Sequence, residues 1–225
     1  MRVKDLVAFA FISHQNKATF KKLIPKTGLH IVSDRGLPVS EVGAKTHQYC
    51  LSHLLRNLQG LAEHTGTSIE EAQRIGEIHA AIQLLFFDKH RMEAKEISLN
   101  FWRQYGYRTW QFIEELIEEL LENNPGKKVS RFFHKIQKSW NHFKVYLRRA
   151  DFPMTNNPAE EALRSFVIAR KLCFGSRSEY GLAWRAEIQS CVETLHRHGR
   201  SILDFISHAI QIHRDGNSNP DISFI

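Results

Sequence analysis

The pattern of hydrophobic and polar positions divides the chain into a short apolar N-terminal part and a long helical part. The apolar runs DLVAFAFI (5–12) and LHIVS (29–33) are rich in strand formers, so each predicts a buried strand. Between them, NKATFKKLI (16–24) is amphipathic and ends before a proline, which predicts a short helix. This strand–helix–strand order predicts a parallel pair of strands joined by a crossover.

From residue 68 onward, the hydrophobic spacing is helical throughout. It predicts helices over residues 68 to about 105, 109–124, 129–149, 158–171, 181–198 and 201–214. The chain is therefore expected to be α/β and predominantly helical. The expected parts are a partial core (1–62), a helical insertion (63–150), C-terminal helices (151–214) and a flexible tail (215–225).

The charge balance changes this picture by suggesting a class of partner. Lys and Arg number 31 against 24 Asp and Glu, giving a net charge of +7, and a basic surface favours polyanions, nucleic acid first among them. No segment approaches the ~20 apolar residues that cross a membrane. The 3 scattered cysteines suit a reducing compartment. We therefore expect a cytoplasmic protein without a membrane partner.

The charges of the two central helices are also segregated. Residues 109–124 carry glutamates and no basic residue, whereas residues 126–149 carry lysines and arginines and no acidic residue. One interpretation is a helical hairpin held by opposite charges. The other is that the basic helix, with Arg148 and Arg149 at its end, lies along a nucleic-acid backbone.

Two carboxylates stand where chemistry could take place. Asp34 follows the second predicted strand, at the carboxyl end where open α/β sheets place ligands, although an aspartate in SDRG also starts a turn. Glu160 lies in TNNPAEEALRSFVIARK. With Asn157 as the N-cap and Pro158 at the first helical position, Glu160 occupies the capping-box position.

A helical wheel gives Glu160 a second interpretation. At about 100° per residue, Glu160, Arg164 and Lys171 fall on one edge of the apolar face that Ala159, Leu163, Phe166 and Val167 form. Glu160 could form an i,i+4 ion pair with Arg164. Alternatively, it could hold a divalent metal ion beside cations that neutralise DNA phosphates.

The segment HQYCLSH places His47, Cys50 and His53 three residues apart, a spacing that invites a zinc site. On a helix these three side chains would spread over about 120°, and no further pair of ligands with suitable spacing follows. A buried junction between a strand and a helix is the preferred interpretation.

Four segments in this order carry a resemblance to a known family: IVSDRG, HQYCLSHLLRNL, TNNPAEEALRSFVIARK and CFGS. From about residue 7 to about residue 213, the chain resembles the transposases of the insertion sequence 66 family. These are Asp-Asp-Glu transposases with a ribonuclease-H-like catalytic fold. The helices between Asp34 and Glu160 would then be an insertion within that fold.

The resemblance implies roles for particular residues. Asp34 would be the second and Glu160 the third acidic residue of the catalytic triad, together holding Mg²⁺ or Mn²⁺. Arg164, Arg170 and Lys171 match basic positions and would contact DNA at transposon ends. The implied activity is metal-dependent phosphodiester cleavage and strand transfer.

The sequence departs from the family pattern at the first acidic residue. The family carries its first aspartate in an Asp-Glu-Thr context, whereas only Asp5 precedes Asp34 here. The segment VAFAFIS resembles the third strand of the family fold, so we expect a catalytic core that is incomplete at its N-terminus and impaired in activity. The alternative is a DNA-binding or oligomerising remnant without chemistry, which would associate with full-length transposase or with itself.

Overall fold

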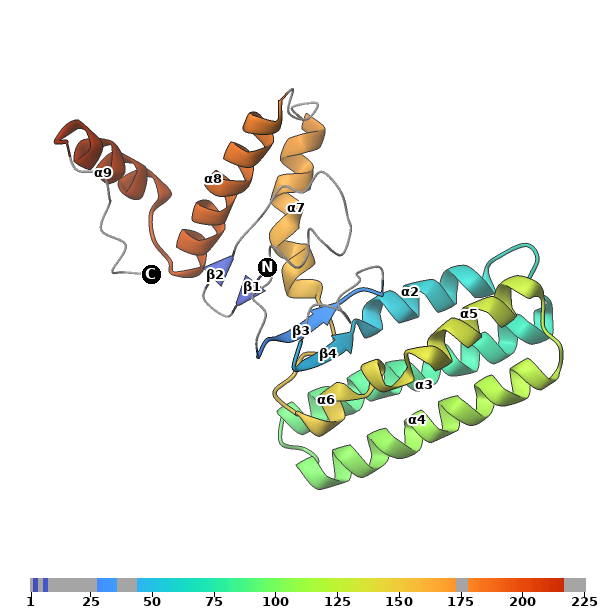
Figure 1. The fold of residues 1–225 in the computed structure, drawn as a ribbon. Helices are drawn as coiled ribbons and strands as arrows, with labels where there is room; N and C mark the ends of the chain where they lie inside the picture. The colour runs from blue at the N-terminus through green and yellow to red at the C-terminus, as the bar shows by residue number, and fades with distance from the viewer. Residues whose placement is uncertain (1, 4–5, 8–27, 36–43, 173–177, 217–225) are drawn as a thin grey trace. The chain divides into compact units, whose positions relative to one another are not determined.

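The computed structural model describes residues 2–3, 6–7, 28–35, 44–172 and 178–216. The chain forms two compact units, residues 16–156 and residues 1–15 with 157–225. The first contains β3 (His30–Ser33), β4 (Thr46–Tyr49), α2 (Leu51–Ala62), α3 (Ile69–Glu93), α4 (Leu99–Glu122), α5 (Lys127–Lys138), the 3₁₀ helix η2 (Trp140–Phe143) and α6 (Val145–Arg148). The second contains β1 (Arg2–Val3), β2 (Leu6–Val7), α7 (Asn157–Leu172), α8 (Glu179–Arg197) and α9 (Ile202–Arg214). The prediction of a predominantly helical chain is confirmed (Figure 1).

The described parallel pair of the first unit is one that the sequence did not predict, and most of the predicted partner of β3 lies outside the described residues. β3 pairs in parallel with β4, with Ser33 opposite Tyr49, whereas the expected partner was the run 5–12. Of that run only Leu6–Val7 is described, as a strand antiparallel to Arg2–Val3. The helix predicted over 16–24 lies outside the described residues.

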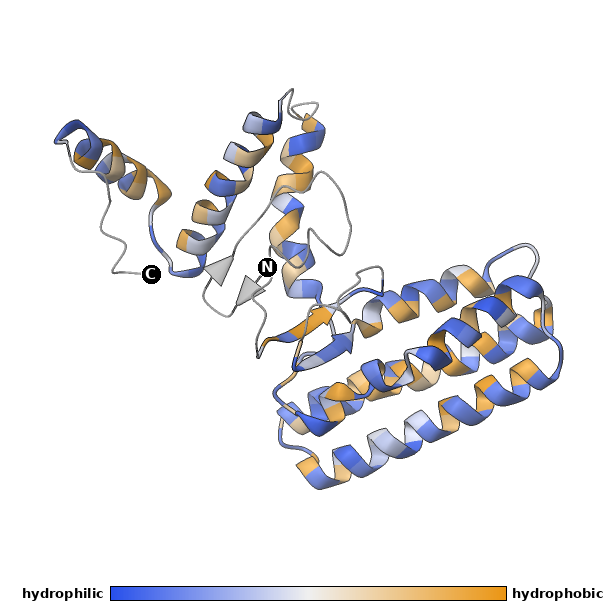
Figure 2. Cartoon of the chain, viewed as in Figure 1, coloured by the Kyte–Doolittle hydropathy of each residue, from blue (hydrophilic) through white to orange (hydrophobic). Residues whose placement is uncertain are grey.

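Helices α2 to α5 lie side by side and bury one apolar stripe each (Figure 1). Hydrophobic and hydrophilic residues alternate along these helices in Figure 2, as one-sided burial requires. The largest buried side chains of this core include Trp102, Trp110, Phe133, Phe143 and Tyr146. This core supports the two-stranded sheet at one end of the bundle.

The break between the first two long helices lies earlier than predicted. α3 ends at Glu93 and α4 begins at Leu99, because Ser98 caps α4 by accepting a hydrogen bond from Phe101 N. Gly106 does not interrupt the helix. A Cβ there would lie 2.5 Å from Leu147 Cδ2, so this glycine allows a close approach of α4 and α6.

The helix predicted over 129–149 is divided into α5, η2 and α6. The fully buried side chain of Gln48 explains the break. Its Nε2 donates to Phe143 O at 3.2 Å, and its Oε1 accepts from Tyr146 N at 3.1 Å. A side chain that bonds helix backbone groups replaces the regular i→i−4 ladder.

In the second unit, α7, α8 and α9 agree closely with the predicted helices. Gly199 follows the end of α8 with a φ of +62°. The helical wheel was wrong about part of α7. Leu163 and Val167 were assigned to the apolar face that packs in the core, yet they are 43% and 37% exposed. The described hydrogen bonds between α7 and α8 involve Ser165, whose hydroxyl donates to Glu193 at 2.9 Å.

Within the described ranges, no helix combines the length and the apolar character that crossing a membrane requires.

Candidate functional site

Asp34 lies at the carboxyl end of β3, on a pocket of about 730 Å³ within the first unit. The described residues that line the pocket are Asp34, Arg35, Tyr49, His53, Asn57, Lys128, Arg131, Phe132, Lys135, Lys138 and Ser139. They come from the ends of β3 and β4, from α2 and from the length of α5. The prediction that Asp34 follows a strand is confirmed, and the structure adds that it lines a pocket.

The pocket is strongly basic because one face of α5 borders it. Lys128, Arg131, Lys135 and Lys138 are spaced by three, four and three residues, which places them on one stripe of the helix. The opposite face buries Val129, Phe133 and Ile136. These four side chains are exposed, and none forms an ion pair with a residue that the structure describes.

The glutamates of α4 do not neutralise this stripe. Glu119 pairs with Arg74 of α3, and Glu114 lies 3.7 Å from Lys144, which precedes α6. Burial lowers the pKa of Lys144, while Glu114 acts in the opposite direction. Among the described ion pairs, the one between Glu114 and Lys144 is therefore the only one that supports a hairpin held by opposite charges. The cations of α5 face the pocket instead.

Arg35 extends the positive surface next to Asp34. Its guanidinium carbon lies 5.0 Å from the centre of the Phe132 ring on α5, a cation–π arrangement that joins the end of β3 to the basic helix. Burial lowers the pKa of Arg35, and the nearby Tyr49 opposes the shift. An arginine remains protonated under such shifts. No sequence signal singles out Arg35 beyond its place beside Asp34.

A buried polar layer supports the end of β3. His47 Nε2 lies 2.8 Å from Ser33 Oγ, and this hydroxyl donates to the carbonyl of Asp34 at 2.7 Å. Because the hydroxyl has a single proton, His47 must be the donor in the first bond. Burial lowers the pKa of His47 to about 4, and the neighbouring His142 contributes in the same direction.

The zinc interpretation of HQYCLSH finds no support in the described structure. His47 lies on β4 and Cys50 precedes α2, so the segment is the buried junction that was preferred. Cys50 Sγ accepts a hydrogen bond from Asn156 N at 3.4 Å, and His53 Nε2 lies 3.0 Å from Arg56. Among the described residues, no group of His, Cys, Asp and Glu could hold a metal ion.

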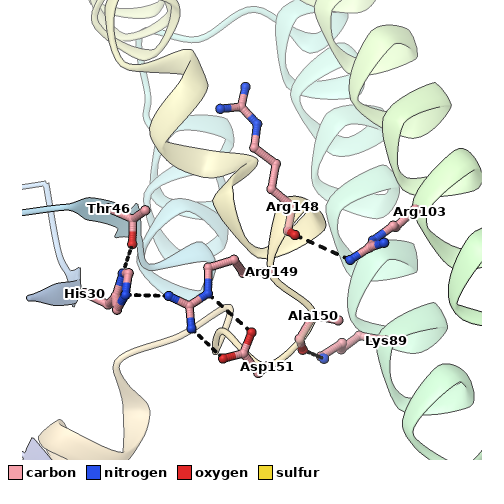
Figure 3. Close-up of polar contacts among 8 residues, drawn as sticks. All are labelled: His30, Thr46, Lys89, Arg103, Arg148, Arg149, Ala150 and Asp151. Atoms are coloured by element: carbon pink, nitrogen blue, oxygen red, sulfur yellow. Dashed lines mark hydrogen bonds and ion pairs between the residues drawn. The ribbon is translucent and has the colours of Figure 1, made fainter. Parts of the chain in front are cut away.

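Arg148 and Arg149, both predicted to contact DNA, differ in their surroundings (Figure 3). Arg149 donates to Asp151 at 2.7 Å and to His30 Nε2 at 2.6 Å. The hydrogen bond with Asp151 raises the pKa of Arg149 and lowers that of Asp151. His30 begins β3, about 13 Å from Asp34 at ~3.3 Å per residue, so Arg149 lies away from the basic pocket.

Arg148 is exposed, and its backbone carbonyl accepts a hydrogen bond from the guanidinium of Arg103. In Figure 3 its guanidinium points away from these contacts. Arg148 therefore remains a predicted DNA contact, whereas Arg149 has a structural partner that the sequence reasoning missed.

Glu160 and the three cations Arg164, Arg170 and Lys171 lie on α7, in the second unit. Glu160 is half-buried, and the cations are exposed. The helix begins at Asn157, so Glu160 lies one position beyond the capping-box position. No ion pair joins Glu160 to Arg164 in the described part of this unit. The roles of these four residues remain predictions.

The described residues of the first unit do not by themselves provide a site for Mg²⁺. Asp34 is the only carboxylate among the described residues that line its pocket, whereas Mg²⁺ needs oxygen ligands and is repelled by nearby cations. The described lining suits a phosphate group better than a metal ion. A metal site would therefore need Glu160 or another carboxylate in addition to Asp34.

Comparison with known proteins identifies the family. The family model described as "Transposase IS66 family" matches residues 3–183. No curated protein and no solved structure matches the chain. The family match includes β3 with Asp34, the helical bundle, and α7 with Glu160. Because it covers well over half of the sequence, this chain belongs to the IS66 family of transposases.

Proposed function

We propose that this protein acts on DNA in transposition, with Asp34 and Glu160 as the acidic residues that act at a phosphodiester. The family match supports a function in transposition. The single observation that carries the proposal is the position of Asp34, at the end of a parallel strand and on a pocket bordered by cations. A carboxylate among cations is an arrangement in which a phosphate can be held close to an acidic group.

In this proposal, the cations of the chain bind DNA and the two carboxylates bind the metal ion. Exposed lysines and arginines hold the phosphates by charge, with Arg164, Arg170 and Lys171 as further contacts on α7. Asp34 and Glu160 are the predicted ligands of the Mg²⁺ or Mn²⁺ ion that Asp-Asp-Glu transposases use. The ribonuclease-H-like fold belongs to the proposal as well, on the basis of the family resemblance.

A second candidate is DNA binding without cleavage. The observation that favours it is the lining of the pocket, where five cations face one carboxylate. Such a pocket can hold DNA whether or not a metal site forms. Under this candidate, Asp34 and Glu160 contribute nothing to activity, and the protein competes with active transposase for DNA.

Nicking of supercoiled DNA distinguishes the two candidates. The full chain is incubated with plasmid in Mg²⁺, in Mn²⁺ and in EDTA, alongside Asp34→Asn, Glu160→Gln and Glu161→Gln. Catalysis predicts metal-dependent nicking that both Asp34→Asn and Glu160→Gln abolish, while the matched control Glu161→Gln retains it. Equal losses from Glu160→Gln and Glu161→Gln would contradict the assigned role of Glu160. Binding of plasmid without nicking in either metal would support the second candidate.

A further inference from the structure

The basic stripe of α5 is an arrangement that does not stabilise its own helix. Lys128, Arg131, Lys135 and Lys138 are neighbours at i,i+3 and i,i+4, where like charges repel. Lys127 and Lys128 also lie in the first turn of α5, next to the positive end of the helix dipole. Lys135 and Lys138 lie in the last turn, where the helix dipole favours cations. The repulsion within the stripe therefore remains at its N-terminal half, where a negatively charged partner would relieve it.

Among the described ion pairs, none involves a cation of the stripe. The two α4 glutamates with ion pairs bind Arg74 and Lys144 instead. The opposite face of α5 is fixed in the core by Val129, Phe133 and Ile136, which are each 1% exposed. The orientation of the stripe is thus set by packing, and its charges point into the pocket beside Asp34.

The length of the stripe fits the backbone of a nucleic-acid strand. From Lys128 to Lys138 the helix rises by about 15 Å at ~1.5 Å per residue. One strand of duplex DNA rises about 3.4 Å per phosphate along the axis, and because it winds around the axis its successive phosphates lie roughly twice that far apart, so the stripe spans about three phosphates. Arg35, stacked on Phe132, continues the positive surface to the carboxylate of Asp34.

We propose that α5 is a track for the sugar–phosphate backbone of one DNA strand, leading that strand to Asp34. Lys128, Arg131, Lys135 and Lys138 contact successive phosphates, and Arg35 contacts the phosphate nearest Asp34. This inference rests on the proposed function, because it takes DNA as the substrate. It adds a binding surface on the helical bundle, separate from the basic residues of α7. Contacts of this kind hold DNA without reading its sequence.

The test is binding of a fluorescein-labelled DNA duplex by the full chain, followed by anisotropy at several salt concentrations. The track variant is Lys128→Gln with Lys135→Gln. The control is Lys127→Gln with Arg108→Gln, which removes the same charge from exposed positions that do not line the pocket. A charge-preserving variant, Lys128→Arg with Lys135→Arg, completes the set.

The expected result is a loss of affinity of roughly tenfold or more for the track variant. Its plot of log K against log salt should also become shallower by about 2, one for each lost phosphate contact. The control and the charge-preserving variant should bind nearly as the wild type does. Near-ultraviolet circular dichroism confirms that each variant is folded.

Equal weakening of the track variant and the control would overturn the track, because net charge would then explain binding. A track variant that binds with wild-type affinity and salt slope would overturn it too. Tighter binding of an RNA duplex of the same sequence would replace DNA as the partner. If the wild type binds no nucleic acid at all, the proposed function fails together with the track.

Discussion

Acidification should destabilise the first unit through His47, which lies on β4 beside the strand that presents Asp34. His47 is 5% exposed, and its Nε2 is committed to Ser33 Oγ. Its Nδ1 is buried and has no hydrogen-bond partner among the described residues. Protonation would place an N–H at this Nδ1 without an acceptor, which explains why burial lowers the pKa of His47 to about 4.

The sign and the size of the effect follow from this pKa. In the unfolded chain, histidine titrates near pH 6.5. Between about pH 6.5 and pH 4, the unfolded state therefore binds a proton at His47 that the folded state does not bind. Stability from His47 is therefore complete above pH 6.5 and is lost as the pH falls towards 4. The difference of about 2.5 pH units corresponds to roughly 3 kcal/mol, of which about 2 kcal/mol is lost between pH 7 and pH 4.5.

Urea unfolding followed by tryptophan fluorescence measures this loss. The buried tryptophans Trp102, Trp110 and Trp140 all belong to the first unit, whereas Trp184 is 55% exposed. The reference is His47→Gln, whose amide can still donate to Ser33 Oγ but does not titrate. Wild type should lose about 2 kcal/mol more than the variant between pH 7 and pH 4.5. Parallel losses in the two proteins would refute the assignment of the pH dependence to His47.

Three further substitutions test the contacts that shape the bundle. Gly106→Ala should lower stability by about 1 kcal/mol or more in thermal unfolding, because overpacking against Leu147 outweighs the gain in helix propensity; a rise in melting temperature would show that Leu147 moves aside. Gln48→Leu should cost about 1–3 kcal/mol in urea unfolding by leaving buried backbone groups of η2 and α6 unsatisfied, and a loss below ~0.5 kcal/mol would contradict this. Glu71→Ala should cost about 1–2 kcal/mol, since this carboxylate completes the capping box of α3 and also accepts from Gly126 N; faster hydrogen exchange at Gly126 would confirm the link, and unchanged exchange would argue against it.

Several helix ends were predictable from sequence because a local signal marks them, although the local N-cap Ser98 of α4 was missed. Ser68 and Ser201 cap α3 and α9 through their own side chains, and Gly199 follows α8 with positive φ. Such signals act within one turn of the chain and need no distant partner. The helices α7 to α9 accordingly agree with the predicted ranges to within two residues.

Local signals failed where a distant residue decided the backbone. Gln48 lies nearly a hundred residues before the helix that it interrupts, and no spacing within 129–149 reveals it. The predicted helix ended near residue 105, whereas α4 continues through Gly106, which allows a close contact with Leu147. In both cases a contact between remote segments outweighs local propensity.

The candidate site likewise combines features that depend on local sequence with features that depend on distant contacts. Sequence alone determined that Asp34 follows a strand, that Glu160 opens a helix, and that positive charge is concentrated in residues 126–149, because these properties depend on neighbours in the chain. Only the tertiary structure decided that β4 pairs with β3, that α5 turns its cations towards Asp34, and that Arg149 is held by Asp151. Those outcomes depend on which faces the core buries, and burial is settled by packing among distant segments.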